Sequence, residues 1–173
     1  SALTLTTATL SEEGADYSID VAYPQFGHAE IDAAVKKVVD DLAAYLREQA
    51  AGDTPTKQGF RPYELFGGFD AVFISADVVS ATLNVAQDFG GAHPLPIVIG
   101  LNYDAKTGRE LVLDDALRMI GLTLELVSEG AREQLSESLD KDFASDEVFS
   151  EGADPDPENY QTFRIDEGKV TFI

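Results

Sequence analysis

The amino-acid sequence predicts an α+β fold, in which two main helices pack against an antiparallel sheet. Three observations support this class: alternating apolar runs near both ends of the chain, one long segment of helical periodicity, and several strand-like runs between residues 60 and 113. The whole chain, residues 1–173, is expected to form a single domain. A chain of this length can bury about 70% of the surface that its unfolded form exposes.

A β-hairpin is predicted to open the chain. Apolar residues alternate with small or polar ones from Tyr17 to Tyr23, which is the period of a half-buried strand. The Thr- and Leu-rich run Leu3–Leu10 supplies the partner strand, and Ser11–Gly14 supplies turn residues. Pro24 is expected to end the second strand, because proline cannot donate a hydrogen bond to a neighbouring strand.

The clearest element is a helix that begins at Ala29. Apolar residues recur at steps of three and four, while charged residues occupy the other side. Gly52 and Pro55 are expected to end this helix. The predicted apolar stripe consists of Ile31, Val35, Val38, Val39, Leu42, Tyr45 and Leu46.

Residues 60–113 predict three or four antiparallel strands. Short β-branched and aliphatic runs are separated there by Gly, Asn and Asp. The segment Asn102–Leu111 predicts a hairpin with its turn at Lys106–Gly108, because Gly108 can take a positive φ.

Two helices are predicted next. Asp114 or Asp115 can cap a short helix that runs through Ile120. A second helix is expected from about Leu124 to Leu139. Its predicted apolar face consists of Val127, Ala131, Leu135 and Leu139.

The end of the chain differs in kind. The segment Asp146–Tyr160 is rich in acids and contains Pro155 and Pro157, which favours an extended, solvated loop. Apolar residues from Phe163 to Phe172 flank Asp166–Gly168 and predict a last hairpin.

The charge balance excludes several functions. The chain has 32 Asp and Glu against 12 Lys and Arg, so its formal net charge at pH 7 is -20. A nucleic-acid binder gathers Lys and Arg on one face, and here no basic run exceeds two residues. Anionic lipid is disfavoured for the same reason, and direct membrane insertion is not expected because no stretch approaches ~18 apolar residues. A cationic partner or salty surroundings are favoured.

Catalytic and cofactor motifs are sparse. The chain has no cysteine and only two histidines, His28 and His93, which excludes Cys-ligated metals and a three-His zinc site. The motifs HExxH, GxSxG, GxGxxG and the P-loop are absent from the sequence, and no cofactor is expected. The alternating oxygen side chains of Asp154–Asn159 suggest calcium, but the glycine and glutamate of an EF-hand loop are missing. A solvated acidic loop without metal is the favoured interpretation.

The segment Phe89–Pro94 is the main candidate site. Gly90 and Gly91 could let a ligand approach the backbone, with His93 as acid, base or metal ligand. The favoured interpretation is structural: the glycines form a bulge or crossover, and His93 bonds a nearby backbone carbonyl.

The sequence also resembles a bacterial extracytoplasmic domain family. In that family, GGAHP precedes an N-Y/F-D-x-x-T-G-x-x-L-x-L-x-D segment, and here these motifs are Gly90–Pro94 and Asn102–Asp115. The family is shared by the lysozyme-sensing anti-sigma factor RsiV and the non-catalytic amino-terminal region of the peptidoglycan deacetylase PdaC. Weaker matches are Val79–Ser80, Glu151–Gly152, Pro157–Tyr160, Phe163 and Val170–Phe172, so the resemblance covers most of residues 15–173.

The resemblance implies an α+β fold. Most members of the family have no assigned function. It marks Gly90, Gly91, His93, Asp104 and Gly108 as a functional or structural motif. The deacetylase's metal-binding Asp and His motifs are absent from the sequence, so that activity is not transferred. The family continues beyond Val170–Phe172 with an aromatic-rich segment, whereas this chain stops at Ile173; a natural end and truncation are both compatible.

The resemblance and the charge together predict a non-enzymatic extracytoplasmic binding or sensing domain. Its expected partner is a basic protein such as lysozyme, or a cell-wall component such as peptidoglycan. A removed amino-terminal segment could tether it to the membrane, as in a lipoprotein. The alternative is a hydrolase of cell-wall glycan or peptide that uses His93 with Asp88 or Asp104 as acid and base. A third interpretation takes the acidity as an adaptation to a saline habitat.

Overall fold

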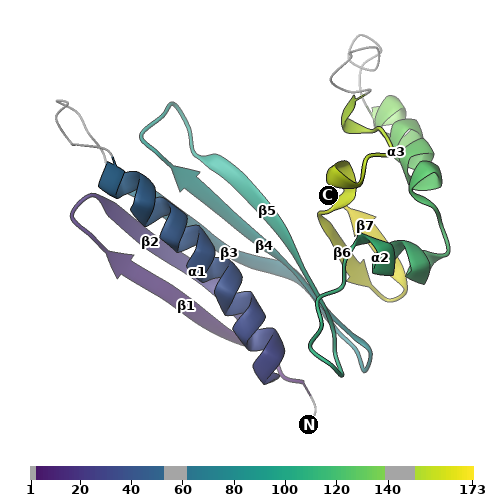
Figure 1. The fold of residues 1–173 in the computed structure, drawn as a ribbon, viewed down its shortest axis with the longest axis horizontal. Coiled ribbons are helices and arrows are strands. Elements are labelled where there is room, and N and C mark those ends of the chain that lie inside the picture. Colours follow the sequence, from purple (N-terminus) through teal and green to yellow (C-terminus); the bar gives the residue numbers. More distant parts are fainter. Residues whose placement is uncertain (1–2, 53–61, 139–150) are drawn as a thin grey trace. The chain divides into compact units, whose positions relative to one another are not determined.

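The computed structural model describes residues 3–52, 62–138 and 151–173. Its internal contacts divide the chain into two compact units, Ser1–Glu110 and Leu111–Ile173. The predicted α+β class is confirmed, because a mostly antiparallel sheet is combined with helices (Figure 1). A single domain over residues 1–173 stays a prediction.

The first unit is built on a five-stranded sheet. Its strands lie in chain order, and every neighbouring pair is antiparallel except β2 and β3, which are parallel. The helix α1, Ala29–Gly52, connects these two strands and lies along one face of the sheet (Figure 1). The strands are β1 Thr6–Glu13, β2 Tyr17–Gln25, β3 Tyr63–Ile74, β4 Val78–Asp88 and β5 Leu95–Asp104.

The core of this unit lies between α1 and the sheet. Side chains alternate along each strand, so residues such as Val21, Leu65 and Leu83 point to the helix while their neighbours point to the opposite face. The predicted helix is confirmed from Ala29 to Gly52. Tyr45 of the predicted stripe is 49% exposed. The buried residues of α1 are Ile31, Val35, Val39, Ala43, Leu46 and Ala50.

The predicted amino-terminal hairpin is confirmed, but two details of it are wrong. Ser11–Glu13 belong to β1, and the chain reverses after Gly14, whose N–H donates to the Tyr17 carbonyl at 2.8 Å. Pro24 lies inside β2, where it pairs with Thr7. Because β3 pairs only with Tyr17–Val21, β2 has one neighbour at Pro24, and the missing N–H is tolerated as at a sheet edge.

The region after α1 contributes three strands, as predicted. β3 carries a bulge between Asp70 and Phe73, and Ala71 has a positive φ of 49° there. The predicted turn at Lys106–Gly108 is present, with Gly108 at φ 70°. Its second arm is shorter than expected, since only the isolated bridge between Tyr103 and Glu110 forms.

The second unit combines helices with a small hairpin. Its elements are α2 Leu113–Ile120, α3 Leu124–Ser138, the short 3₁₀-helix η1 Pro157–Tyr160, β6 Phe163–Asp166 and β7 Lys169–Phe172. Both predicted helices and the last hairpin are confirmed. The core includes Val127, Ala153, Tyr160, Phe163 and Ile165. On the predicted apolar face of α3, Val127 is buried and Leu135 is exposed, while Leu139 lies outside the described residues.

Of two local predictions in the second unit, one is confirmed and one is wrong. α2 begins at Leu113, and Asp115 caps it from the first turn, where its carboxylate accepts the N–H of the N-cap residue Val112 at 3.1 Å. The stretch before β6 is not extended, because Asp156 caps η1 by accepting the Glu158 N–H at 3.0 Å. Asp146–Ser150 of that predicted loop lie outside the described residues. Within the described part of the chain, no helix is long and apolar enough to cross a membrane.

Candidate functional site

The GGAHP motif forms the loop that joins β4 to β5. The register of these strands runs unbroken from Val78 opposite Asp104 to Gln87 opposite Leu95. The Asp88 carboxylate accepts the Gly90 N–H at 2.7 Å, and Gly90 has a φ of 75°. The expected bulge or crossover is therefore wrong, since the glycines form a hairpin loop.

His93 lies at the exposed tip of this loop. Its Nδ1 is 3.4 Å from the carbonyl oxygen of Pro94, the next residue. This contact with a backbone carbonyl is of the kind expected, but it is long for a hydrogen bond and lies at the surface. The imidazole is thus accessible to solvent instead of holding a buried crossover.

The base of the loop is held by aromatic contacts. The Phe89 ring meets Tyr63 of β3 edge to face, with ring centroids 5.2 Å apart, and Tyr45 of α1 at 6.1 Å. These contacts link the start of the GGAHP loop to the helix and to the neighbouring strand.

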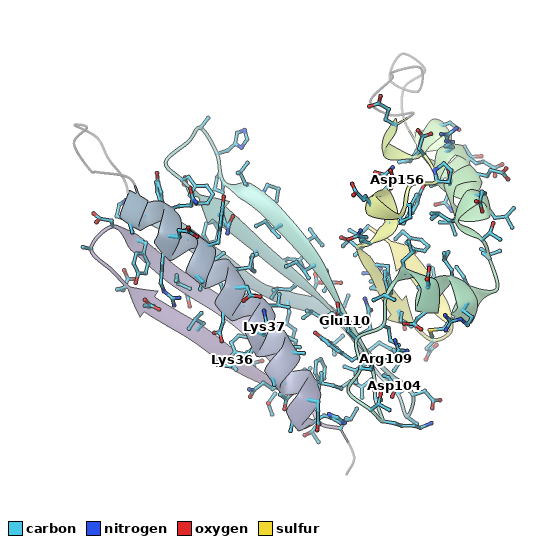
Figure 2. The ribbon with its side chains drawn as sticks, in the orientation of Figure 1. Lys36, Lys37, Asp104, Arg109, Glu110 and Asp156 are labelled. Atoms are coloured by element: carbon cyan, nitrogen blue, oxygen red, sulfur yellow. The ribbon has the colours of Figure 1, made fainter. Side chains whose placement is uncertain are left out.

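Asp104 lies at the other end of β5 (Figure 2). It begins a second turn, in which the Gly108 N–H donates to the Asp104 carbonyl at 2.9 Å. The Asp104 carboxylate accepts the N–H groups of Thr107 at 2.8 Å and Lys106 at 2.9 Å. These two hydrogen bonds, that from Thr107 first, hold the pKa of Asp104 below its ordinary value. The carboxylate therefore shapes the turn.

Gly108 packs this turn against the beginning of α1. A Cβ atom at position 108 would lie 2.7 Å from Glu30 Cβ and 2.9 Å from His28 Cε1. The His28 ring is itself 3.1 Å from the Glu30 carboxylate, measured from Nδ1 to Oε2. The glycine thus serves both the positive φ and a close approach of two segments.

The middle of the motif is buried in the sheet. Ser80 Oγ donates to Asn102 Oδ1 at 2.8 Å, between directly paired residues of β4 and β5. The next residue, Tyr103, is buried, and burial with the nearby Glu110 carboxylate raises its pKa to about 12. Asn102 and Tyr103 therefore stabilise the β4–β5 pair.

The predicted site residues do not converge on one place. Gly90, Gly91 and His93 lie before β5, whereas Asp104 and Gly108 lie at its end and beyond. Since β5 has ten residues, its two ends are roughly 30 Å apart. A His93–Asp104 acid–base pair is therefore not formed, and Asp88 already accepts a hydrogen bond from the loop. In the described ranges, no cluster of three or more His, Cys, Asp or Glu residues could hold a metal ion.

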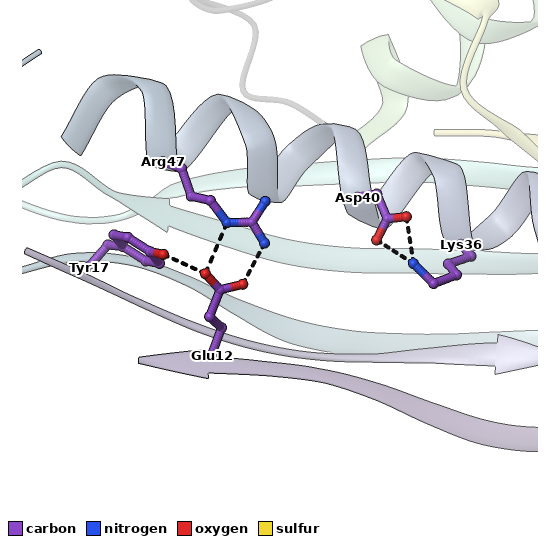
Figure 3. A network of polar contacts seen from close by, with 5 residues as sticks. All are labelled: Glu12, Tyr17, Lys36, Asp40 and Arg47. Carbon is purple, nitrogen blue, oxygen red and sulfur yellow. Dashed lines mark hydrogen bonds and ion pairs between the residues drawn. The ribbon is translucent and has the colours of Figure 1, made fainter. Parts of the chain in front are cut away.

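The sequence interpretation missed a polar network on α1. Arg47 donates from Nε to Glu12 Oε1 at 3.1 Å and from Nη2 to Glu12 Oε2 at 2.5 Å, and the Tyr17 hydroxyl also donates to Glu12 (Figure 3). Arg47 first and Tyr17 second lower the pKa of Glu12. Glu12 lies between Ser11 and Glu13, whose side chains point outward. Once these residues are assigned to β1, the alternation of a strand predicts that the Glu12 side chain points inward.

A second missed feature is the charge of the sheet itself. The five strands β1–β5 contain no Lys or Arg, although they contain several acids. The basic residues described in the first unit lie on α1 or in the turn after β5: Lys36, Lys37, Arg47, Lys106 and Arg109. The strand boundaries, once known, would have shown this asymmetry.

The chain is related in sequence to a known protein, although no family model matches it. It is 27% identical over 164 residues to the peptidoglycan-N-acetylmuramic acid deacetylase PdaC of Bacillus subtilis strain 168, and the match covers 94% of this chain but 34% of that protein. The chain thus spans about a third of the relative's length.

One solved structure shows the same fold. A DUF3298 family member from Bacteroides fragilis NCTC 9343 superposes with a TM-score of 0.58 at 17% identity, over 99% of this chain and 83% of that one. A DUF3298 family protein from Pseudomonas aeruginosa PAO1 has a TM-score of 0.49 and 20% identity, over 81% and 71% of the two chains. The chain is therefore related in sequence to a segment of PdaC and shares the fold of a DUF3298 family protein.

Proposed function

We propose that this chain is a non-enzymatic extracytoplasmic binding or sensing domain whose partner is a basic protein such as lysozyme. The observation that carries the proposal is the use of the motif's polar groups. Asp104 holds a turn, Asp88 holds a loop, and Ser80 and Asn102 hold each other. Side chains engaged in this way support a scaffold for recognition more than a reaction centre.

The net charge of -20 supports a cationic partner, since opposite charge steers association at rates that fall with salt. The resemblance to the lysozyme-sensing anti-sigma factor RsiV makes lysozyme the first candidate. The relationship to PdaC, named as a peptidoglycan deacetylase, supports a location at the cell envelope.

Isothermal titration of the chain with lysozyme tests this function. Binding should be measured at low ionic strength and at about 0.15 M salt, where exposed charges more than about 8 Å apart are largely screened. Heat of binding at both salt concentrations, together with slower lysis of cell walls by the bound lysozyme, is the expected result. Absence of heat at both salt concentrations removes lysozyme as the partner. Heat that is present at low salt but vanishes at about 0.15 M salt indicates unspecific attraction.

A cell-wall component is the second candidate ligand, favoured by the sequence relationship to a protein named for acting on peptidoglycan. Sedimentation of the chain with purified, insoluble peptidoglycan tests this candidate. Co-sedimentation that persists at 0.15 M salt would support it, and a chain that stays in the supernatant would exclude it.

The hydrolase interpretation is tested at His93. This side chain is exposed, so His93→Ala should leave the fold intact. A cell-wall-degrading activity in the wild-type chain that His93→Ala abolishes would overturn the non-enzymatic proposal. Unchanged turnover in the two proteins would remove His93 from the chemistry.

The saline interpretation is tested by replacing exposed Asp and Glu with Asn and Gln. A change in solubility and salt tolerance alone would favour this interpretation.

A further inference from the structure

In the first unit, the face of the sheet opposite α1 carries both acidic and apolar side chains. The register places Glu13, Ser18, Glu64 and Asp88 in one row across β1–β4. The next row contains Asp20, Phe66 and Pro96. We call Glu13, Asp20, Glu64, Phe66, Pro96 and Val98 the acid-rimmed face.

The centre of the acid-rimmed face is apolar and open. Phe66 is 41% exposed and Val98 is 37% exposed. The neighbouring residues on this face of β3 and β4 include Gly68 and Ala86, which are too small to cover the Phe66 ring. An exposed apolar centre with a charged margin is the arrangement found at protein–protein interfaces, where a central aromatic residue supplies much of the binding energy.

The charge of the acid-rimmed face is uncompensated within the sheet. The strands contain no Lys or Arg, whereas on α1 the lysines pair with acids one turn away, as in Lys36–Asp40 and Lys37–Asp41. Glu13, Asp20 and Glu64 of this face are exposed, so Lys or Arg of a partner can reach them.

We propose that the acid-rimmed face is the docking surface for a basic protein, with Phe66 as its apolar anchor and Glu13, Asp20 and Glu64 as the groups that meet Lys or Arg of the partner. The proposal rests on the proposed function and names its surface. Charge complementarity selects the occupant, because a nucleic acid, an anionic membrane or an acidic peptide would be repelled there.

The test compares two pairs of charge variants in the full chain. Asp20→Asn with Glu64→Gln removes two charges from the acid-rimmed face, and Asp40→Asn with Asp41→Asn removes two from α1, so both proteins have the same net charge. Binding to lysozyme is measured by titration at about 0.15 M salt, with cytochrome c as a second basic protein. We expect the first pair to weaken binding about tenfold, as for close charge pairs at an interface, and the second to change it less than twofold.

An apolar pair of variants tests the anchor. Phe66→Ala is expected to weaken binding about tenfold or more, because aromatic anchors dominate interface energies. Leu126→Ala on α3, which is 51% exposed, is the matched control and should leave affinity unchanged. Circular dichroism of each variant checks that the fold is retained.

Carboxylate footprinting locates the surface without any substitution. Carbodiimide labelling of the wild-type chain should modify Asp20 and Glu64 in the free protein, and excess lysozyme should protect both. If the wild-type chain binds neither basic protein, the proposed function and this surface fall together. If it binds but all variants behave alike, or if Asp20 and Glu64 are already unreactive in the free chain, the function stands and the acid-rimmed face is excluded.

Discussion

Ser80 and Asn102 form a buried hydrogen-bonded pair across β4 and β5, with Ser80 Oγ 2.8 Å from Asn102 Oδ1. Ser80→Ala removes a donor from a buried amide oxygen, which costs about 1–3 kcal/mol of the free energy of unfolding. Urea unfolding followed by circular dichroism measures that change. Ser11→Ala, at an exposed position of β1, is the control and should shift the midpoint little. Equal midpoints for the two variants would contradict a stabilising role for the pair.

Glu12 makes stability depend on pH in the acid range. Its pKa is lowered from the ordinary 4.5 by Arg47 first and by Tyr17. A carboxyl group with a lowered folded-state pKa contributes stability that is fully present above about pH 4.5 and is lost as the pH falls through the folded value. Glu12→Gln should therefore be less stable than the wild type at pH 6, and the difference should shrink towards pH 3.

Chemical unfolding at several pH values between 3 and 6 follows that difference. Glu13→Gln is the matched control, since Glu13 is the next residue of β1 and its side chain points to the opposite face of the sheet. A gap between Glu12→Gln and the wild type that stays constant with pH would show that the Arg47 contact contributes by packing and not by charge.

Two motif glycines, Gly90 and Gly108, share a positive φ but differ in their surroundings. A Cβ at Gly90 would meet nothing within 4 Å, whereas a Cβ at Gly108 would lie 2.7 Å from Glu30 Cβ. Gly90→Ala should therefore cost about 1 kcal/mol, from backbone strain alone. Gly108→Ala should cost clearly more, because α1 and the turn must also separate. Thermal unfolding of both variants measures the order, and a Gly90 variant that is the less stable would contradict it.

Gly67 permits close contact between β3 and β4. A Cβ there would lie 2.3 Å from the Asn84 carbonyl oxygen, and Gly67 has a φ of 148°. Gly67→Ala should lower the free energy of unfolding by more than about 3 kcal/mol, because the obstructing atoms belong to the backbone. Gly68→Ala is the matched control, since its Cβ would make only an ordinary contact of 3.9 Å with Ala22. Differential scanning calorimetry of both proteins distinguishes these outcomes.

Elements with a strong local period were predictable from the sequence. The stripe from Ile31 to Leu46 predicted α1, and the alternation from Tyr17 to Tyr23 predicted β2. Turn-forming residues gave a wrong prediction where tertiary contacts determine the secondary structure. Ser11–Glu13 look turn-forming, yet they extend β1 because Glu12 reaches Arg47 and Tyr17. Asp115, by contrast, caps α2 as its residue type predicts, since its carboxylate accepts the Val112 N–H from within the first turn.

The candidate site was only partly predictable, because spacing along the chain does not reveal strand register. His93 and Asp104 are eleven positions apart, which is compatible with a shared site on a folded-back loop, but β5 holds them at opposite ends. Conversely, Asp20 lies far in sequence from Glu64 and Phe66, and only the pairing of β2 with β3 brings it beside them. No local pattern encodes that parallel pairing.

The parallel junction between β2 and β3 also bears on how the first unit folds. The hairpin β1–β2 and the meander β3–β5 each join strands that are neighbours along the chain, so they can form from local contacts. Joining the two pieces requires Tyr17 to meet Tyr63, across α1 and the residues that follow it. Loop-closure entropy must be overcome before that contact stabilises the chain, so docking of the two pieces on α1 is the step expected to limit the folding rate.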